Sequence, residues 1–589
     1  MKRYLIIQWL RANTQWLLFV LLTICIAGKC LVWHMQFFGE KDLPVFGCLC
    51  SAMILSSGVL LCRRRPWWIL VLLVAVNIWL FANFVYERAW GKMLSADMIR
   101  MLGNLRGFED SVLLYFHRDM LYWLFVPDIV CIAAIAFWQP QQKRLWKAFG
   151  AVVVIWLLCL PLQQIKYYKQ VLWIKTTYNT STGFNRWWII HEPLFNPLAW
   201  PQDAAFETFR QQTPQSWARE FVHHHGILHF GPALWAFDAR YNKWEHLIMD
   251  EAVELTAEQQ ASLAQLIQQE KDFVPKRSLI FILVESLESW AIDYPLGDSY
   301  VMPNLHNLIH KHPVLYAPQM YCQMEWGGSS DGQLMAMTGL LPINKGVTVA
   351  LYGDQPFPNY AHYFPQSITL NPSPGTWKQD IVNPNYGIKI LEESDSIRDD
   401  AGIFIRLNTI DFAEPTFVLA ITVSSHAPYS KASEIDLPMD VDMPETMAKY
   451  LKCLYYMDCQ LGTFLKRLES DPIIKNADIV ITGDHIIFFQ KDWQQMQAYA
   501  ASKGIDCLGE GDNTTAMILI SPTIKESIIR TEPTYQMDIY PTILHMIGCT
   551  DPAWCGVGLD LLGNGPRSLN GREAAELSDK LIRGRYFSK

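Results

Sequence analysis

The sequence has no excess of positive charge and no stripe of basic residues. Its 49 Lys and Arg are outnumbered by 57 Asp and Glu, which gives a formal net charge of -8. A protein that binds nucleic acid through its phosphates needs a basic surface. The composition therefore argues against a nucleic-acid partner.

Cysteine pairs with metal-binding spacing, repeats and low-complexity tracts are also missing. None of the 13 cysteines belongs to a Cys-x-x-Cys pair, which argues against a cysteine-ligated zinc site. No segment repeats at a fixed period, so a solenoid is not indicated. The length of 589 residues exceeds that of one ordinary domain.

Long apolar runs are almost absent after residue 165 but frequent before it. Five runs are long enough, or nearly so, to cross the roughly 30 Å of a bilayer core. The first run contains Lys29, lacks a clear small-residue cleavage site and is followed by further runs, so it is not a cleaved signal peptide. We predict a five-helix transmembrane bundle with spans at 15–36, 43–62, 66–86, 119–138 and 146–163.

Positive charges predict the orientation of these spans. Basic clusters precede the first run and separate the second from the third and the fourth from the fifth. Because positive charges stay on the cytoplasmic side, an odd number of spans places everything after residue 165 outside. Asp128 lies within the fourth run and is a functional candidate; the alternative is a residue near the interface or a cap of a Pro-kinked helix.

From about residue 277 the pattern changes to short apolar runs separated by helical patterns. Four runs read as strands, at 278–285, 417–424, 477–482 and 516–520. Alternating strands and helices favour an α/β domain with a largely parallel sheet. We predict four parts: a transmembrane domain (1–165), a helical connector (166–276), a catalytic domain (277–565) and a C-terminal tail (566–589).

Polar side chains follow three of the predicted strands. Glu285 ends the first strand, His426 follows the second, and Asp484 and His485 follow the third. Ligands gather at the carboxyl ends of parallel strands, and carboxylates with an imidazole suit a divalent cation. The sequence therefore predicts a metal site at this edge, although each acid alone reads equally as a helix cap or an ion-pair partner.

A candidate nucleophile lies between the first two of these strands. Ser329 follows two glycines and precedes a helical pattern. Glycines permit a sharp turn, and a helix start favours an anion such as phosphate. Coordination to a metal would lower the pKa of the hydroxyl and make it a nucleophile. The alternative is that Ser329 or Ser330 only caps the helix.

Two groups of histidines are interpreted as surface residues rather than metal ligands. The cluster of His223, His224, His225 and His229 contains three adjacent residues, which point in different directions on a helix and cannot all face one ion. A surface or membrane-proximal segment is favoured there. His306, His310 and His312 lie on a second predicted helix and at its exit.

Together, these motifs resemble the lipoteichoic acid synthase family, a phosphoglycerol transferase branch of the alkaline phosphatase and sulfatase superfamily. The matching segments are LVESLESW (283–290), MPNL (302–305), GGSSDGQLMAMTGLLP (327–342), SSHAPY (424–429), TGDH (482–485), DIYPTIL (538–544) and GVGLDLL (556–562). The resemblance covers most of the chain beyond residue 277, and the five-span topology matches it. It implies an alkaline phosphatase-like, extracytoplasmic catalytic domain on a multi-pass protein of the bacterial cytoplasmic membrane.

The resemblance also implies roles for individual residues. Glu285, Asp484 and His485 would bind the metal. Ser329 would be the fourth ligand and the nucleophile that carries a phospho intermediate. His426 would contact the substrate or protonate a leaving oxygen, and Trp377 would lie beside the lipid headgroup.

Two positions depart from the family pattern. The family typically has Thr where Ser329 stands. Its headgroup-binding Arg, after the Trp, is Gln379 here, which removes a bidentate donor for phosphate or glycerol. Lys378 or Gln379 would then contact a different headgroup.

The resemblance implies a divalent metal, with Mn favoured and Mg or Zn as alternatives. It also implies a phospholipid donor, a glycan or lipid acceptor of the cell envelope, and a membrane location. Transfer of phosphoethanolamine is an alternative, as is a non-catalytic sensor. A sulfatase is disfavoured because neither Cys322 nor Ser329 lies in the Cys/Ser-x-Pro-x-Arg setting that formylglycine formation requires.

Overall fold

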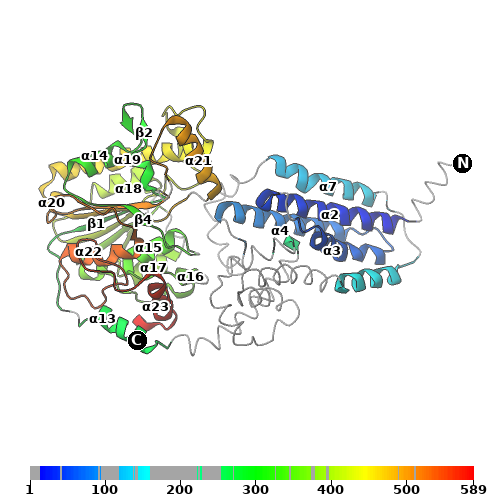
Figure 1. Ribbon diagram of the computed structural model, residues 1–589, viewed down its shortest axis with the longest axis horizontal. Helices are drawn as coiled ribbons and strands as arrows, with labels where there is room; N and C mark the ends of the chain where they lie inside the picture. Colours follow the sequence, from blue (N-terminus) through cyan, green and yellow to red (C-terminus); the bar gives the residue numbers. More distant parts are fainter. Residues whose placement is uncertain are drawn as a thin grey trace, which may run out of the picture. The chain divides into compact units, whose positions relative to one another are not determined.

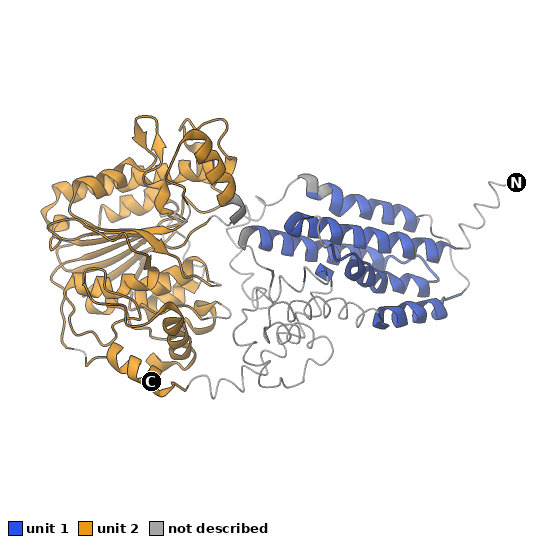
Figure 2. Cartoon of the chain, in the orientation of Figure 1, with its two compact units in different colours: residues 1–100, 108–247 blue, residues 101–107, 248–589 orange. Residues whose placement is uncertain are grey.

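The structure is a computed structural model that divides into two compact units. Unit 1 comprises residues 1–100 and 108–247, and unit 2 comprises residues 101–107 and 248–589 (Figure 2). The described residues are 13–39, 43–90, 93–94, 118–136, 138, 143–158, 222, 226–228 and 254–588, except 270, 326, 344–346, 373–377, 393–396, 488–489 and 510–512. The predicted boundaries at 165, 276 and 565 stay predictions, and most of the predicted connector, with His223 to His225 and His229, lies outside the described residues.

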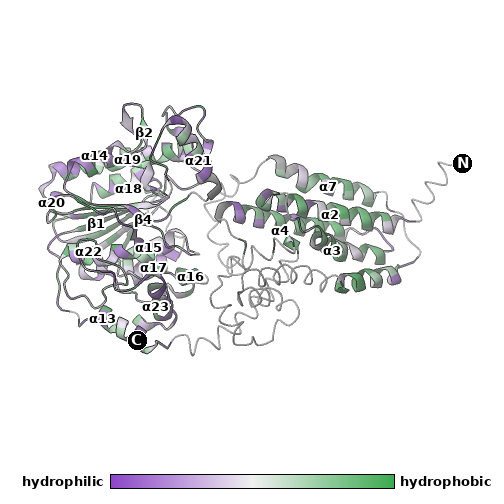
Figure 3. Ribbon diagram, viewed as in Figure 1, coloured by the Kyte–Doolittle hydropathy of each residue, from purple (hydrophilic) through white to green (hydrophobic). Residues whose placement is uncertain are grey.

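Unit 1 contains apolar helices at the five predicted positions (Figure 3). They are α2 (Thr14–Phe38), α3 (Val45–Ser56) continued by the 3₁₀ turn η1 (Ser57–Leu61), α4 (Trp68–Trp90), α7 (Arg118–Ala136) and a helix at Trp146–Leu158. Among the described residues, two stretches, Thr14–Phe38 and Trp68–Arg88, are long and apolar enough to cross a membrane, and the other helices are shorter. An N-terminal apolar helical region is therefore confirmed, whereas five membrane spans are not.

Asp128 lies in a buried polar cluster that joins three of these helices. Its carboxylate pairs with Lys29 of α2 and accepts a hydrogen bond from Asn77 Nδ2 of α4 at 2.6 Å. Lys29 Nζ also donates to Asn77 Oδ1 at 2.8 Å. Because the Lys29 side chain is completely buried, removal of either charged group would leave the other buried and without a counter-charge. The cluster therefore stabilises helix packing and places Asp128 away from a helix cap.

Unit 2 is built on a nine-stranded mixed sheet with the order β10-β4-β9-β8-β1-β7-β5-β6, and β11 pairs with β4. Its strands are β1 (Leu279–Val284), β4 (Leu315–Tyr321), β5 (Gln366–Leu370), β6 (Ile390–Glu392), β7 (Thr416–Ile421), β8 (Asp478–Gly483), β9 (Thr515–Ile520), β10 (Ile528–Ile529) and β11 (Thr534–Tyr535). All pairs are parallel except β4–β9 and β8–β9. The predicted α/β class and all four predicted strands are confirmed.

Helices cover both faces of this sheet (Figure 1). One face carries α14 (Pro303–Lys311), α18 (Asp400–Leu407) and α19 (Glu445–Ser470), and the other carries α15 (Ser329–Thr338) and α22 (Ile539–Ile547). In β1, Ile280, Ile282 and Val284 enter one core cluster together with Leu454 of α19. The intervening residues of β1 are equally buried, which explains its uninterrupted apolar sequence.

Shorter elements complete unit 2. They are α13 (Ala257–Leu266), η3 (Ser289–Ala291), β2 (Pro295–Leu296), β3 (Ser299–Tyr300), α16 (Thr348–Tyr352), η4 (Tyr360–Tyr363), α17 (Gln379–Asn385), η6 (Ser430–Glu434), α20 (Pro472–Lys475), α21 (Gln490–Lys503), η7 (Gln536–Asp538), α23 (Gly571–Arg583) and η8 (Tyr586–Ser588). Residues 566–589, predicted as a tail, include α23, which Asn570 caps. Ser578 of α23 is buried and accepts a hydrogen bond from Leu341 N at 3.0 Å, so this helix packs on the rest of unit 2.

Candidate metal and nucleophile site

Two adjacent parallel strands, β1 and β8, bring the predicted metal ligands to one edge of the sheet, and the neighbouring β7 leads to His426. Strand β1 lies between β7 and β8, and Val284 is in register with Gly483. Glu285 and Asp484 are the next residues on their strands, so the register alone makes them neighbours. The expectation that these strand ends meet is therefore confirmed.

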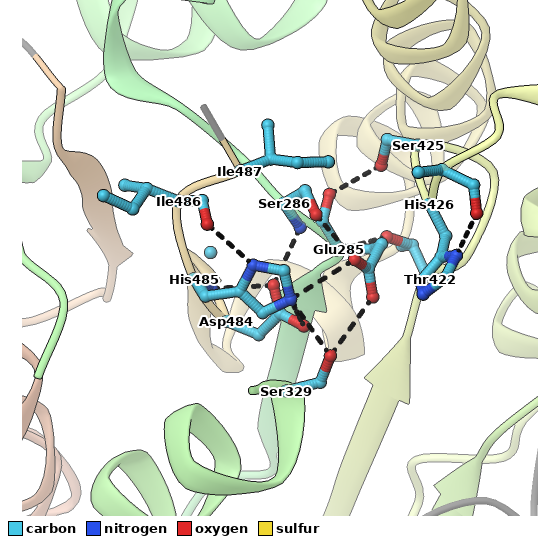
Figure 4. A network of polar contacts seen from close by, with 12 residues as sticks. Glu285, Ser286, Ser329, Thr422, Ser425, His426, Asp484, His485, Ile486 and Ile487 are labelled. Atoms are coloured by element: carbon cyan, nitrogen blue, oxygen red, sulfur yellow. Dashed lines mark hydrogen bonds and ion pairs between the residues drawn. The ribbon is translucent and has the colours of Figure 1, made fainter. Parts of the chain in front are cut away.

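The side chains of Glu285, Asp484 and His485 converge on one point (Figure 4). One ligand atom from each lies within 4.8 Å of the other two. His485 Nε2 is 3.5 Å from Glu285 Oε1 and 3.6 Å from Asp484 Oδ2. Two carboxylates and an imidazole form a donor set for a hard or borderline divalent cation.

Ser329, the first residue of α15, directs its hydroxyl to this group. Its Oγ lies 3.2 Å from His485 Nε2 and donates to Glu285 Oε2 at 3.5 Å. The preceding Gly328 has a φ of 50° and a ψ of -124°, a conformation that side-chain-bearing residues rarely adopt. The Gly-Gly pair therefore makes the sharp turn that the sequence indicates.

Two further features hold the start of α15 in place. The buried Asp331 accepts hydrogen bonds from Glu325 N at 3.0 Å and Gly327 N at 2.8 Å. A Cβ placed on Gly332 would lie only 2.0 Å from the backbone oxygen of Asp484, so only glycine permits this close approach. The helix that carries Ser329 thus packs directly against the segment that carries Asp484.

The helix start differs in one respect from the sequence-based expectation of free backbone N–H groups. The N–H groups of Ser330 and Asp331 donate to the carbonyls of Gly327 and Gly328, each at 3.0 Å. These two donors are therefore satisfied within the turn. Any preference for an anion must come from the helix dipole and from the neighbouring side chains.

Burial makes the electrostatics of this group unfavourable without a cation. Glu285 is 5% exposed and Asp484 is 1% exposed. Burial and the charge of Glu285 raise the pKa of Asp484 to about 7. Burial also opposes ionisation of Glu285, but the charges of His426 and His485, together with hydrogen bonds to Ser286 and Asp484, outweigh it and lower the pKa of that carboxyl. A divalent cation would neutralise the two adjacent carboxylates, so the residues present fit a metal.

Ser286 is a supporting residue that the sequence does not reveal. It has a φ of 51°, which is uncommon for a residue other than glycine. Its hydroxyl donates to Glu285 Oε1 at 2.6 Å and its N–H donates to Asp484 Oδ1 at 2.7 Å. Tyr450 of α19 donates to the Ser286 carbonyl at 2.7 Å. Ser286 therefore orients both carboxylates, and only tertiary contacts define its backbone.

The segment after β7 supports Glu285 from the other side. Thr422 Oγ1 accepts a hydrogen bond from Glu285 N at 2.9 Å, and Ser425 Oγ donates to Glu285 O at 2.6 Å. His426 is half-buried and interacts electrostatically with Glu285. Thr422 and Ser425 could have been found from the sequence, because they belong to a run of polar residues directly after an apolar strand.

The predicted headgroup residues are only partly described. Trp377 lies outside the described residues. Lys378 is exposed, and its Nζ donates to the carbonyl of Ala350 at 2.9 Å. Gln379 is 5% exposed and donates to Gln333 of α15 at 2.6 Å. Its Oε1 has no hydrogen-bond partner in the described part of the chain. Gln379 therefore contacts α15, the helix that begins with Ser329, and keeps one acceptor atom without a described partner.

Two family models match the chain. The lipoteichoic acid synthase N-terminal domain matches residues 1–186, and the sulfatase model matches residues 375–549. Lipoteichoic acid synthase 1 of Bacillus subtilis is 20% identical over 551 residues, which cover 89% of this chain and 80% of that protein. Both model matches and the relatives named lipoteichoic acid synthase support a lipoteichoic acid synthase-like family for this chain. The predicted membership of the alkaline phosphatase superfamily, and with it an enzyme of this class, is confirmed.

Other similarities are more limited. The lipoteichoic acid synthase-like protein YvgJ of Bacillus subtilis is 24% identical over 311 residues, which span about half of each protein (49% of this chain and 50% of YvgJ). The crystal structure of the lipoteichoic acid synthase LtaP from Listeria monocytogenes aligns with a TM-score of 0.44 at 17% identity, covering 56% of this chain and 98% of that chain. The roles of individual site residues therefore rest on the geometry described above.

Proposed function

We propose that this chain is a membrane-anchored, metal-dependent phosphotransferase. It moves a phosphoglycerol-type headgroup from a phospholipid to a glycan or lipid of the cell envelope through a phospho-Ser329 intermediate. The observation that carries the proposal is the position of Ser329 Oγ, 3.2 Å from His485 and 3.5 Å from Glu285 at a buried, cation-fitting group. The match to the lipoteichoic acid synthase N-terminal domain and the relatives named as synthases support it.

Glu285, Asp484 and His485 would hold the cation, with Ser329 Oγ as a fourth ligand. A bound cation would supply Lewis acidity, which lowers the pKa of a hydroxyl and neutralises charge on phosphoryl oxygens. Mn is the favoured ion, with Mg or Zn as alternatives. Ser286 and Thr422 fix Glu285, so the protein provides a preorganised site rather than one assembled on binding.

In the first half-reaction, Ser329 Oγ, whose hydroxyl proton has first been lost to solvent, attacks the phosphorus of the donor headgroup. The Oγ–P bond forms while the bond between phosphorus and the glyceride oxygen breaks. His426 supplies the proton to that oxygen, and diacylglycerol leaves. In the second half-reaction, a hydroxyl of the acceptor attacks the same phosphorus and passes its proton to His426, and the Oγ–P bond breaks. Each half-reaction conserves the phosphodiester, so no co-reactant is required.

The apolar helices of unit 1 suit a lipid donor. We propose that all five span the cytoplasmic membrane and that the catalytic unit lies outside the cell, as the basic clusters predict. Membrane anchoring would provide the donor at high local concentration. ATP is not expected in that compartment, so a lipid is the natural source of the phosphoryl group.

Gln379 bears on the choice of headgroup. Its Oε1 is an acceptor without a described partner. Because this oxygen is buried, a headgroup with a hydrogen-bond donor would reach it only after Gln379 or its neighbours move. Glycerol hydroxyls and the ammonium of ethanolamine both provide such a donor. Phosphoethanolamine transfer is therefore the second candidate, favoured by the replacement of the family Arg by an uncharged amide.

The other two alternatives receive less support. A sulfatase would require the Cys/Ser-x-Pro-x-Arg setting that Cys322 and Ser329 lack. A non-catalytic sensor would not need a complete set of ligands and nucleophile, yet Glu285, Ser329, Asp484 and His485 are gathered at one point.

The proposal is tested with the full chain in vesicles that contain either phosphatidylglycerol or phosphatidylethanolamine, with Mn²⁺, Mg²⁺ or Zn²⁺ present in turn. We expect diacylglycerol release from one of the two lipids, and its loss in Ser329→Ala and Glu285→Gln. Ser433→Ala changes an exposed serine on η6 and serves as the matched control with full activity. No diacylglycerol from either lipid with any of the three metals would contradict the proposed reaction.

A further inference from the structure

A second group of side chains that could bind a metal lies on and beside α14. This helix supplies none of the catalytic group, by which we mean Glu285, Ser329, Asp484 and His485. His306 and His310 are four residues apart, so both lie on one face of this helix. Asp293, in the segment between η3 and β2, faces them. Its Oδ1 lies 2.7 Å from His306 Nδ1 and 4.0 Å from His310 Nε2. The sequence could not join Asp293 to the two histidines, because the contact depends on how the 289–300 segment folds over α14.

The group is held in place by its surroundings. The ring of Tyr300 on β3 stacks on His306 with a centroid distance of 3.7 Å and an interplanar angle of 19°. Asp458 of α19 accepts hydrogen bonds from the N–H groups of Asn304 and Leu305 at 2.9 and 2.8 Å. The start of α14 is thereby fixed to α19, and His306 is fixed between Tyr300 and Asp293.

We propose that Asp293, His306 and His310 form a second metal site, which takes an imidazole-preferring divalent cation of the Zn²⁺ class. One ligand atom from each residue lies within 4.8 Å of the other two. Ligand bonds of about 2.0–2.2 Å around zinc bring such atoms to roughly 3.4 Å from one another in a tetrahedron. That geometry requires two adjustments: a small rotation of His310, whose side chain is 57% exposed, and a lengthening of the 2.7 Å contact between His306 Nδ1 and Asp293 Oδ1.

The chemistry of this group differs from that of the catalytic site. Two imidazoles and one carboxylate favour Zn²⁺, Cu²⁺ or Ni²⁺ over Mg²⁺ or Mn²⁺. The side chain of Asp293 is 45% exposed, so water can complete the coordination. A hydrogen bond between His306 and Asp293 alone would account for two of the residues. It would not include His310, whose Nε2 also approaches Asp293 Oδ1, at 4.0 Å.

An ion at this position would tie the segment that follows Glu285 to α14. Asp293 lies eight residues after Glu285 in the sequence, and η3 connects them. The site would therefore stabilise unit 2 independently of catalysis. Zn²⁺ binding at this site can be measured without any lipid substrate. Its outcome is therefore independent of whether the proposed phosphotransfer reaction takes place.

The test uses the full chain in detergent micelles, with Zn²⁺ alone as the probe, equilibrium dialysis and elemental analysis. Asp484→Asn serves as the background, because loss of this carboxylate should weaken Zn²⁺ binding at the catalytic group. We expect this background to retain one Zn²⁺ per chain that the further change His310→Ala weakens by at least about tenfold. His312→Ala is the matched control, since His312 lies just beyond the same helix, is 45% exposed and is outside the group. It should leave the bound Zn²⁺ unchanged.

Two outcomes would overturn the proposal. One is an Asp484→Asn protein that retains no Zn²⁺ while its circular dichroism matches that of the wild type. The other is an equal loss of Zn²⁺ in His310→Ala and His312→Ala, which would indicate adventitious binding to exposed histidines. His306→Ala provides a second variant, and it should lower Zn²⁺ affinity as His310→Ala does.

Discussion

Replacement of Gly332 by alanine should impair catalysis while leaving every proposed catalytic residue in the chain. The new Cβ would lie 2.0 Å from the backbone oxygen of Asp484 and 2.8 Å from its carbonyl carbon. Ordinary contact begins at 3.4 Å, so α15 and the Asp484 segment must separate by roughly 1.4 Å, the difference between 3.4 and 2.0 Å. Both neighbours are backbone, and Gln536 Nε2 also holds the same oxygen at 2.7 Å. The strain therefore cannot be relieved by rotating a side chain.

The separation would move Ser329, three residues earlier on the same helix, relative to His485. A displacement of about 1 Å at a reacting group can cost roughly a hundredfold in rate, and overpacking costs about 1–3 kcal/mol in stability. We expect diacylglycerol release by Gly332→Ala to fall about a hundredfold, with a lower thermal midpoint. Gly571→Ala, at the start of α23 where no atom lies within 4 Å of the new Cβ, is the control. Activity of Gly332→Ala within twofold of wild type would refute the packing argument.

Three further predictions concern charge. Lys29→Met leaves Asp128 buried without its partner, so it should cost about 3–5 kcal/mol in stability. The double variant Lys29→Met/Asp128→Leu should recover most of the lost thermal midpoint, measured in detergent. Equal midpoints for the single and the double variant would argue against the ion pair. Burial raises the pKa of Asp458 to about 6 from 3.8. The folded state then binds a proton more tightly than the unfolded chain, so this stabilisation is present at low pH and is lost as the pH rises through 6. Between about pH 4 and pH 6 the thermal midpoint of wild type should therefore fall relative to that of Asp458→Asn, and parallel curves would contradict the shift. Removing divalent cations with a chelator should lower the midpoint of wild type more than that of Glu285→Gln, and equal shifts would argue against a cation at Glu285.

Much of the catalytic unit was predictable because its strands are buried on both faces. Uninterrupted apolar runs mark β1, β7 and β8, and polar residues directly after them mark the edge where a ligand binds. Parallel neighbours then bring Glu285, Asp484 and His485 together without further information. The two glycines before Ser329 likewise indicated the turn, because the conformation of Gly328 suits glycine alone.

Features set by tertiary contacts could not be predicted. The left-handed backbone of Ser286 depends on Tyr450 and Asp484, which are far away in sequence. The burial of Gln379 depends on Gln333 of another helix. Hydropathy located the five apolar helices of unit 1 but could not settle how many cross the membrane, because helix length in the fold differs from the length of an apolar run.

Intact-mass spectrometry of the full chain would detect the proposed phospho-Ser329 intermediate itself. Wild type, Ser329→Ala and Ser433→Ala would each be incubated with Mn²⁺ and donor lipid in the absence of acceptor, and peptide mapping would locate any adduct. We expect an adduct on Ser329 in wild type and Ser433→Ala, with the mass of a glycerophosphoryl or an ethanolamine-phosphoryl group, and none in Ser329→Ala. Diacylglycerol release by wild type without an adduct, or an adduct that persists in Ser329→Ala, would contradict the proposed intermediate.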